Sequence, residues 1–209
     1  MTVEKSNIAD FGIEKLPVME HFYTIQGEGF YTGHAAYFIR LAGCDVGCTF
    51  CDVKESWEIG EHPIMQLEDL VGLIGNANVV VVTGGEPSIY PLERLSGLLK
   101  ERGVRRHMET SGSHEITGEW DWICLSPKKR KMPVESSWKK AHELKVVISR
   151  KNDFDFAEKC AEQVGEDCLC YLQPEWDKEQ IILPEIIDYI KANPKWKMSL
   201  QTHKYMDIP

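Results

Sequence analysis

Three closely spaced cysteines form the strongest chemical signal in the sequence. Cys44, Cys48 and Cys51 follow the spacing C-x3-C-x2-C, and glycines at 43 and 47 allow turns that bring backbone amides close to a bound centre. Three thiolates on a four-iron cluster leave one iron without a protein ligand, so that iron can bind a small molecule. A structural zinc ion would need four protein ligands, and no fourth cysteine lies nearby. On the loop alone, three buried thiols or a zinc site completed by a distant histidine remain the alternatives.

A charged residue and a pair of glycines stand next to apolar runs. Arg40 interrupts residues 37–42, the run that leads into the cysteines. Because a charge is rarely buried without a partner, Arg40 either faces water at a strand end or grips a substrate carboxylate with two parallel hydrogen bonds. Gly84 and Gly85 follow four valines, and at the end of a strand they would let backbone carbonyls approach a bound group such as an ammonium.

Runs typical of strands alternate along the chain with helical spacing. This order predicts an α/β fold with a mainly parallel sheet, right-handed crossovers, and sites at the carboxyl ends of the strands. About six strands fit, which is too few for a complete eight-stranded barrel. The predicted strands span residues 18–24, 37–42, 79–82, 106–110, 122–125, 144–148, 168–174 and 196–201, and the predicted helices span residues 67–74, 92–102, 154–164 and 181–192.

Length and composition indicate one globular domain. The 209 residues divide into a lead-in (1–16), a core (about 17–200) and a short tail (201–209), and a hydrophobic content of 43% is enough for one core. A net charge of −9 argues against a broad nucleic-acid or membrane surface, and no apolar run reaches eighteen residues. Seven cysteines and a polar N-terminus favour the reducing cytoplasm. The cysteines outside the loop are expected to be buried thiols: Cys124, Cys160, Cys168 and Cys170.

The cysteine spacing, with Phe50 directly before the last cysteine, resembles the radical S-adenosylmethionine (SAM) superfamily. In that superfamily the open iron chelates the amino and carboxylate groups of SAM, and one electron from the cluster cleaves SAM to a 5′-deoxyadenosyl radical. The resemblance implies a [4Fe–4S] cluster held by Cys44, Cys48 and Cys51. It also implies a compact core built as a partial (β/α)6 TIM-like barrel.

Further segments resemble the 7-carboxy-7-deazaguanine synthase family of the queuosine pathway. They cover nearly the whole chain in order: residues 24–29, the strand with Arg40, and residues 43–52, 83–87, 109–112, 126–128, 172–174 and 201–205. Gln-Gly-Glu-Gly at 26–29 and Gln-Thr-His-Lys-Tyr at 201–205 separate this family from other radical SAM proteins. The resemblance implies a lyase that converts 6-carboxy-5,6,7,8-tetrahydropterin to 7-carboxy-7-deazaguanine and ammonia. The hydrogen at C6 is removed, the ring contracts, and SAM is re-formed.

The same resemblance implies roles for individual positions. No side chain is expected to act as acid or base, because the cluster and SAM supply the chemistry. The expected SAM contacts are Phe50, Cys51, Asp52, Gly84, Gly85, Glu86, Glu109, Ser111, Ser126, Pro127, Lys128, Gln173, Pro174, Glu175 and Trp176. The expected substrate contacts are Ile25, Gln26, Gly27, Glu28, Arg40, Thr83, His203 and Pro209. Arg40 would pair with the pterin carboxylate, and the terminal carboxylate on Pro209, where that is the natural end, would accept hydrogen bonds from the guanidine-like edge.

One position departs from the family's pattern. The second residue after the last cysteine is often a hydroxyl residue that ligates Mg2+ in that family, but here it is Val53, which has no ligand atom. Mg2+ prefers an octahedral shell of oxygens and tolerates several waters, so substrate, water or Asp52 could still hold it. We expect a weakened or absent dependence on magnesium.

Partners follow from the same resemblance. It implies a small pterin substrate, a homodimer, and a flavodoxin or ferredoxin as electron donor, with no nucleic-acid or membrane partner. The basic residues 128–131 are expected to form a solvated loop in which one or two balance carboxylates of SAM or substrate. Two other functions compete: a small radical SAM activase acting on a protein, which would have no use for Arg40, and a non-catalytic zinc-binding module.

Overall fold

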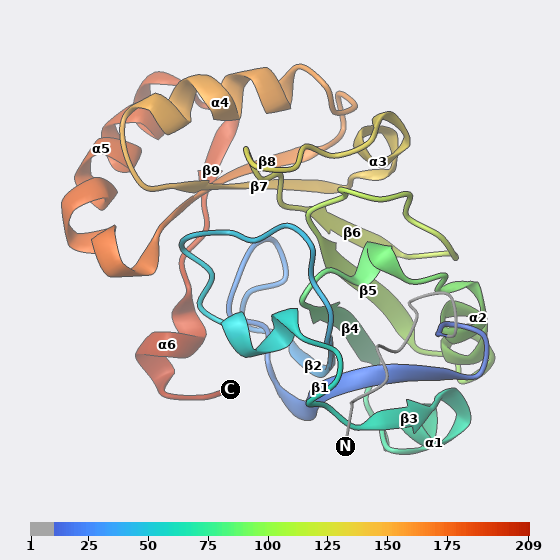
Figure 1. Cartoon of the computed structure of the whole chain (residues 1–209). Coiled ribbons are helices and arrows are strands. Elements are labelled where there is room, and N and C mark those ends of the chain that lie inside the picture. Colours follow the sequence, from blue (N-terminus) through green and yellow to red (C-terminus); the bar gives the residue numbers. More distant parts are fainter. Residues whose placement is uncertain (1–10) are drawn as a thin grey trace.

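The computed structural model describes residues 11–209, so residues 1–10 of the predicted lead-in lie outside the described part. Nine strands form one curved sheet in the order β3-β1-β2-β4-β5-β6-β7-β8-β9 (Figure 1). The strands are β1 Lys15–Ile25, β2 Ala35–Leu41, β3 Ile64–Gln66, β4 Val79–Gly84, β5 Arg105–Thr110, β6 Trp122–Leu125, β7 Glu143–Ile148, β8 Leu169–Pro174 and β9 Trp196–Met198.

Seven of these strands run parallel. Strands β2 and β4 to β9 pair in parallel, while β1 pairs antiparallel with both β2 and β3. The two outermost strands, β3 and β9, do not pair with each other, so the barrel is open on one side. The predicted partial TIM-like barrel is therefore confirmed.

Helices α1 Leu67–Gly72, α2 Glu93–Glu101, α3 Glu135–Lys140, α4 Asn152–Ala161 and α5 Glu179–Ala192 cover the outer face of the sheet. Helix α6 Thr202–Met206 follows the last strand, and three short 3-10 turns are η2 Lys54–Trp57, η3 Pro87–Ile89 and η4 Trp176–Lys178. Ile182 and Ile186, four residues apart on α5, share one buried face. Figure 1 shows α4 and α5 packed along the outside of β7 and β8. No helix within residues 11–209 has the length and apolarity needed to cross a membrane.

Alternation along the strands separates an apolar outer face from a polar inner one. On β7, Leu144, Val146 and Ile148 are buried in the core that α4 and α5 cover. Lys145, which lies between them in sequence, therefore points inside the barrel. Residues 26–34, between β1 and β2, also run inside the curve of the sheet: Gly29 contacts Ser199, and Phe30 stacks on Trp122 (Figure 1).

The predicted elements differ from the structure mainly at the ends of the chain. Eight of the nine strands overlap predicted strand runs, and only the three-residue β3, which is too short to carry a period, was not predicted. Seven strands pair in parallel, rather than the expected six or so. Strand β1 begins at Lys15, so the predicted lead-in is two residues too long. The last strand ends at Met198 rather than 201, and part of the predicted tail forms α6, a helix too short for a sequence signal. Helix α3 was not predicted either.

Candidate active site

A cavity of about 510 Å³ opens at the carboxyl ends of the parallel strands. It brings together nearly all of the predicted site residues, including the three clustered cysteines, Val53, and all eight expected substrate contacts from Ile25 to Pro209. Two expected SAM contacts lie elsewhere. Pro127 lines a neighbouring cavity of about 490 Å³ behind the cysteine loop, and Pro174 is buried at the end of β8 and lines neither cavity. The prediction that the strand ends meet at one site is confirmed.

The cysteine loop forms one wall of this cavity. Its three thiols are partly buried and unpaired, and burial raises the pKa of Cys44 and Cys48. The loop is anchored by Gly43 N, which donates to Ser56 O (2.7 Å), and by Cys44 N, which donates to Trp57 O (3.2 Å). Within residues 11–209, no three His, Cys, Asp or Glu side chains form a group that could hold a single metal ion. A donor set of three thiols facing one cavity fits a [4Fe–4S] cluster that keeps one iron open.

The paired glycines after β4 are required by packing against the cysteine loop. Gly84 has φ +135°, and a Cβ there would lie 2.2 Å from Leu41 O; a Cβ on Gly85 would lie 2.3 Å from Gly43 O. Gly85 N donates to Leu41 O (2.8 Å). The sequence predicted that these glycines admit a bound group. The structure shows that they first admit the backbone of the loop that carries Cys44.

The carboxylate of Glu86 joins the ends of β4 and β5. It is 1% exposed and accepts hydrogen bonds from Ser88 N (2.9 Å), Ser88 Oγ (2.7 Å), Ser111 N (2.7 Å) and the hydroxyls of Thr110 and Ser111. Burial of an ionised carboxylate is tolerated when several donors satisfy its oxygens. The side chains of Glu86 and Ser111 therefore position the wall of the cavity, a role that the sequence did not predict.

Arg40 lies on β2 and faces the cavity. Its Nε donates to Oε1 of Glu20 on β1 at 2.6 Å, and its side chain is 21% exposed. Glu20 therefore neutralises the charge of Arg40 and fixes the orientation of its guanidinium. Within residues 11–209 no protein group bonds the terminal nitrogens of the guanidinium, so they are left for a ligand. Glu20 was not predicted from the sequence, although it stands opposite Arg40 in the β1–β2 register.

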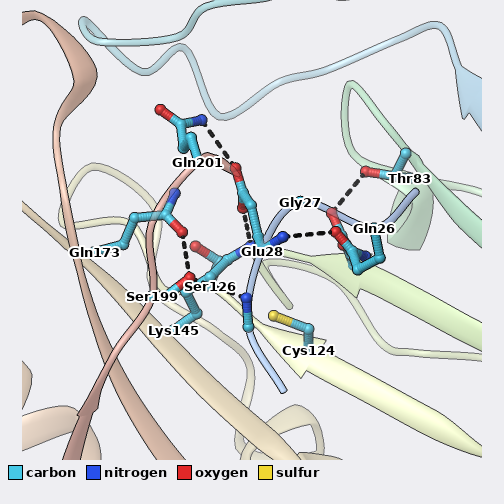
Figure 2. Close-up of polar contacts among 12 residues, drawn as sticks. Gln26, Gly27, Glu28, Thr83, Cys124, Ser126, Lys145, Gln173, Ser199 and Gln201 are labelled. Carbon is cyan, nitrogen blue, oxygen red and sulfur yellow. Dashed lines mark hydrogen bonds and ion pairs between the residues drawn. The ribbon is translucent and has the colours of Figure 1, made fainter. Parts of the chain in front are cut away.

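Glu109 and Glu28 organise the inner residues of the site, and Figure 2 shows Glu28 with its partners Lys145 and Gln201. Glu109 accepts from Gln26 Nε2 at 2.9 Å and from Thr83 Oγ1 at 3.3 Å. Glu28 forms an ion pair with Lys145 and accepts from Gln201 Nε2 at 2.8 Å. Burial raises the pKa of Glu28, but the neighbouring Lys145 ammonium outweighs it, so that the pKa is lowered and Glu28 stays ionised.

The C-terminal segment closes the cavity from the open side of the barrel. Thr202 N donates to Gly27 O (2.9 Å), and the ring of His203 packs so closely on Gly27 that a Cβ there would lie 2.3 Å from Nδ1. Lys204 Nζ bonds Asp52 Oδ2 at 2.7 Å, next to the last cysteine of the loop. Burial raises the pKa of Asp52, but the hydrogen bond and charge of the Lys204 ammonium lower it by more, so the carboxylate stays charged.

Lys145, Gln201 and Lys204 line the cavity but were not among the predicted site residues. Lys145 interrupts an apolar strand run as Arg40 does, so the same signal would have identified it. Gln201 and Lys204 lie in a segment that was singled out only as a family signature. Lys128 takes its expected place, where its Nζ donates to Ser126 O and Ser126 Oγ, both at 2.6 Å.

Comparison with known proteins gives matches along the whole chain. Residues 38–123 match the family model described as the Radical SAM superfamily. The chain is 53% identical over 197 residues to the 7-carboxy-7-deazaguanine synthase of Flavobacterium psychrophilum, and the match covers 94% of each protein. It is 44% identical to the protein of the same name from Synechocystis sp., with 92% of this chain and 93% of the relative covered.

A solved structure has the same architecture. The chain superposes on the structure titled "Crystal structure of QueE from Escherichia coli" with a TM-score of 0.82 and 32% sequence identity. The match covers 96% of this chain and 100% of that one. The similarity therefore extends over nearly the whole chain.

Proposed function

Because the chain belongs to the 7-carboxy-7-deazaguanine synthase family of the radical SAM superfamily, we propose that it converts 6-carboxy-5,6,7,8-tetrahydropterin to 7-carboxy-7-deazaguanine and ammonia. The observation that carries this proposal is the meeting of residues 26–29 with residues 201–205 beside the cysteine loop. Gln201 Nε2 bonds Glu28, and Thr202 N bonds Gly27. These segments are the ones whose sequence is specific to this family, and they form a cavity suited to a small molecule. An activase acting on a protein is not favoured.

The radical SAM family uses a [4Fe–4S] cluster and SAM, and the residues present suit both. Cys44, Cys48 and Cys51 would hold the cluster. When bound, the cluster and SAM supply the one-electron chemistry that removes the hydrogen at C6 of the pterin. The polar rim formed by Ser126 and Lys128, with the backbone at Gly85, supplies donors and acceptors for the charged methionine part of SAM.

The remaining residues bind and orient the pterin. Glu20 holds the guanidinium of Arg40 in place, which leaves its terminal N–H groups to grip the C6 carboxylate in a bidentate manner. Glu109 fixes the side chains of Gln26 and Thr83 on the wall that the ring would contact. Preorganised polar groups of this kind contribute to catalysis because they do not have to reorient when the substrate reacts.

Three further properties are proposals of the same kind. Val53 lies on the cavity wall without a ligand atom, which supports a weak or absent dependence on Mg2+. A flavodoxin or ferredoxin would deliver the electron where Thr49 and Phe50 are exposed, close to the basic residues 128–131. The enzyme would act in the cytoplasm, since seven unpaired cysteines suit a reducing compartment. Membership of the family supports a homodimer.

One anaerobic turnover assay tests the proposal. The cluster is reconstituted and reduced, SAM and 6-carboxytetrahydropterin are added, and mass spectrometry detects 7-carboxy-7-deazaguanine. Product formation supports the reaction, the substrate and the use of SAM together. Cleavage of SAM to 5′-deoxyadenosine without product would retain the superfamily and refute the substrate. A well-formed cluster with neither product would refute the catalytic proposal.

The cysteines provide a matched control. Cys48→Ala should lose most bound iron and the brown colour, because two thiolates hold a four-iron cluster poorly. Cys168 is partly buried and lies just before β8, outside the cysteine loop, so Cys168→Ala should keep the bound iron and the brown colour. Equal iron content in the two variants would contradict the assignment of the loop.

A further inference from the structure

Lys145 is a buried cation that the proposed reaction has not yet used. It lies on β7 with its side chain 6% exposed and faces the cavity together with Cys124 and Gln173 (Figure 2). An ammonium carries three N–H donors. Among residues 11–209, Glu28 is the one acceptor within hydrogen-bonding distance of Nζ. Two donors of a buried cation are thus left to be satisfied from the cavity side.

The surroundings keep this group charged. Burial lowers the pKa of Lys145, but the neighbouring Cys124, followed by the carboxylates of Glu28, Glu109 and Glu143, raises it by more, so the group remains an ammonium. Glu28 is itself held by Gln201, which prevents it from turning around the ammonium to take a second hydrogen bond. The ion pair therefore fixes Nζ without saturating it.

The position of Lys145 relative to Arg40 indicates which ligand atom it meets. Arg40 is on β2 and Lys145 on β7, with β4, β5 and β6 between them, so the two cations stand on different walls of the barrel. A guanidinium fork matches a carboxylate, whereas a single ammonium matches one oxygen. In a pterin the carboxylate at C6 and the ring carbonyl at C4 are separate acceptors of these two kinds.

Resting on the proposed function, we infer that Lys145 recognises the C4 carbonyl oxygen of the pterin ring, donating to it an N–H that the protein leaves unused. Lys145 would then determine specificity, because an analogue with an amino group at C4 would place N–H donors against the N–H donors of the Lys145 ammonium. A site built to hydrogen-bond a substrate group rejects the analogue that lacks it, since the buried partner is left unpaired.

Equilibrium binding tests this role without requiring turnover. Dissociation constants are measured for 6-carboxypterin and for 2,4-diaminopteridine-6-carboxylate, which differ at C4. The wild-type enzyme should prefer 6-carboxypterin by about 10- to 100-fold, the value of one hydrogen bond to a charged group. Lys145→Met should reduce this preference to less than about threefold.

Because Lys145→Met alone leaves Glu28 buried without its cation, the double variant Glu28→Gln/Lys145→Met keeps the test valid if the single variant fails to fold. The double variant should also lose the preference. Tyr171→Phe, which alters the inward-facing neighbour of Lys145 on β8, should keep the preference.

The outcomes separate the two proposals. If the folded wild-type enzyme turns over 6-carboxytetrahydropterin but the double variant keeps its preference, the role of Lys145 is refuted and the proposed function stands. A wild-type enzyme that binds both pteridines equally would also refute that role. If the enzyme with a complete cluster converts no pterin at all, the proposed function itself fails.

Discussion

Gln201 and Glu28 lie 173 positions apart in the chain, yet Nε2 of Gln201 donates a 2.8 Å hydrogen bond to Oε1 of Glu28. The same Gln201 nitrogen lies 3.3 Å from Oδ2 of Asp52, beside the last cysteine. One amide at the end of the chain thus connects the loop inside the barrel to the cysteine loop. Since β3 and β9 do not pair, these side-chain contacts close what the sheet leaves open.

The first prediction concerns this closure. Gln201→Leu removes the donor to Glu28 and Asp52, so KM for the pterin should rise about tenfold while the free energy of unfolding falls by about 1 to 2 kcal/mol. Steady-state kinetics and urea unfolding measure the two effects. Lys191→Ala, on the exposed side of α5, is the control and should change neither. A variant with wild-type KM would show that the C-terminal segment is not needed for substrate binding.

A second prediction compares two glycines. Gly84→Ala places a Cβ 2.2 Å from Leu41 O in a backbone conformation with φ +135°, so it should destabilise the protein by more than about 2 kcal/mol and displace the cysteine loop. Gly97→Ala, on α2 with open space around it, should instead stabilise by about 0.5 to 1 kcal/mol. Thermal unfolding and the iron content after reconstitution report both effects. Similar behaviour of the two variants would refute the packing role of Gly84.

The sequence predicted the parts of the site that follow strands. Thr83 to Glu86 and Ser126 to Lys128 could be placed at the carboxyl edge because an apolar run marks each preceding strand, and a parallel sheet gathers those ends at one edge. The cysteine loop needed only its spacing. The apolar run around Lys145 marks that residue as unusual, but it does not identify its partner Glu28, because that contact depends on how the sheet curls and on the path of residues 26–34 inside it. No local pattern encodes that path.

For the two glycines after β4, the sequence again predicts only part of the structural role. The sequence indicates that Gly84 and Gly85 permit a close approach, but it does not identify the approaching group. The structure identifies it as the backbone at Leu41 and Gly43, a contact between neighbouring parallel strands. Function inferred from a glycine pair alone would therefore mistake packing for binding.

A third prediction concerns acid stability. His107 on β5 is 3% exposed, and burial, followed by the charge of Arg105, lowers its pKa to about 4. The unfolded chain takes up this proton near pH 6.5, whereas the folded chain does so only near pH 4. The folded state therefore binds fewer protons between these values, and its stability is greatest above pH 6.5 and falls as the pH drops to 4.

His107→Gln removes this source of pH dependence. The loss of unfolding free energy between pH 7 and pH 4.5 should be smaller in the variant by on the order of 2 kcal/mol. Urea unfolding at several pH values measures it. Gly97→Ala on α2, which changes no titratable group, should keep the wild-type slope. If His107→Gln keeps that slope too, the buried ring is not the group responsible.

The last prediction concerns magnesium at Val53. This residue lines the cavity next to Asp52, and its backbone carbonyl is occupied by Ser56, whose Oγ donates to it at 2.6 Å. With no side-chain oxygen at this position, the enzyme should keep its activity within about twofold when EDTA removes divalent ions. Val53→Thr supplies a hydroxyl, so its activity should rise with added Mg2+ and fall with EDTA. Val53→Ala, which changes the size but adds no ligand, should behave like the wild-type enzyme. Wild-type activity that is lost on chelation and restored by micromolar Mg2+ would show that substrate, water and Asp52 already complete a magnesium site.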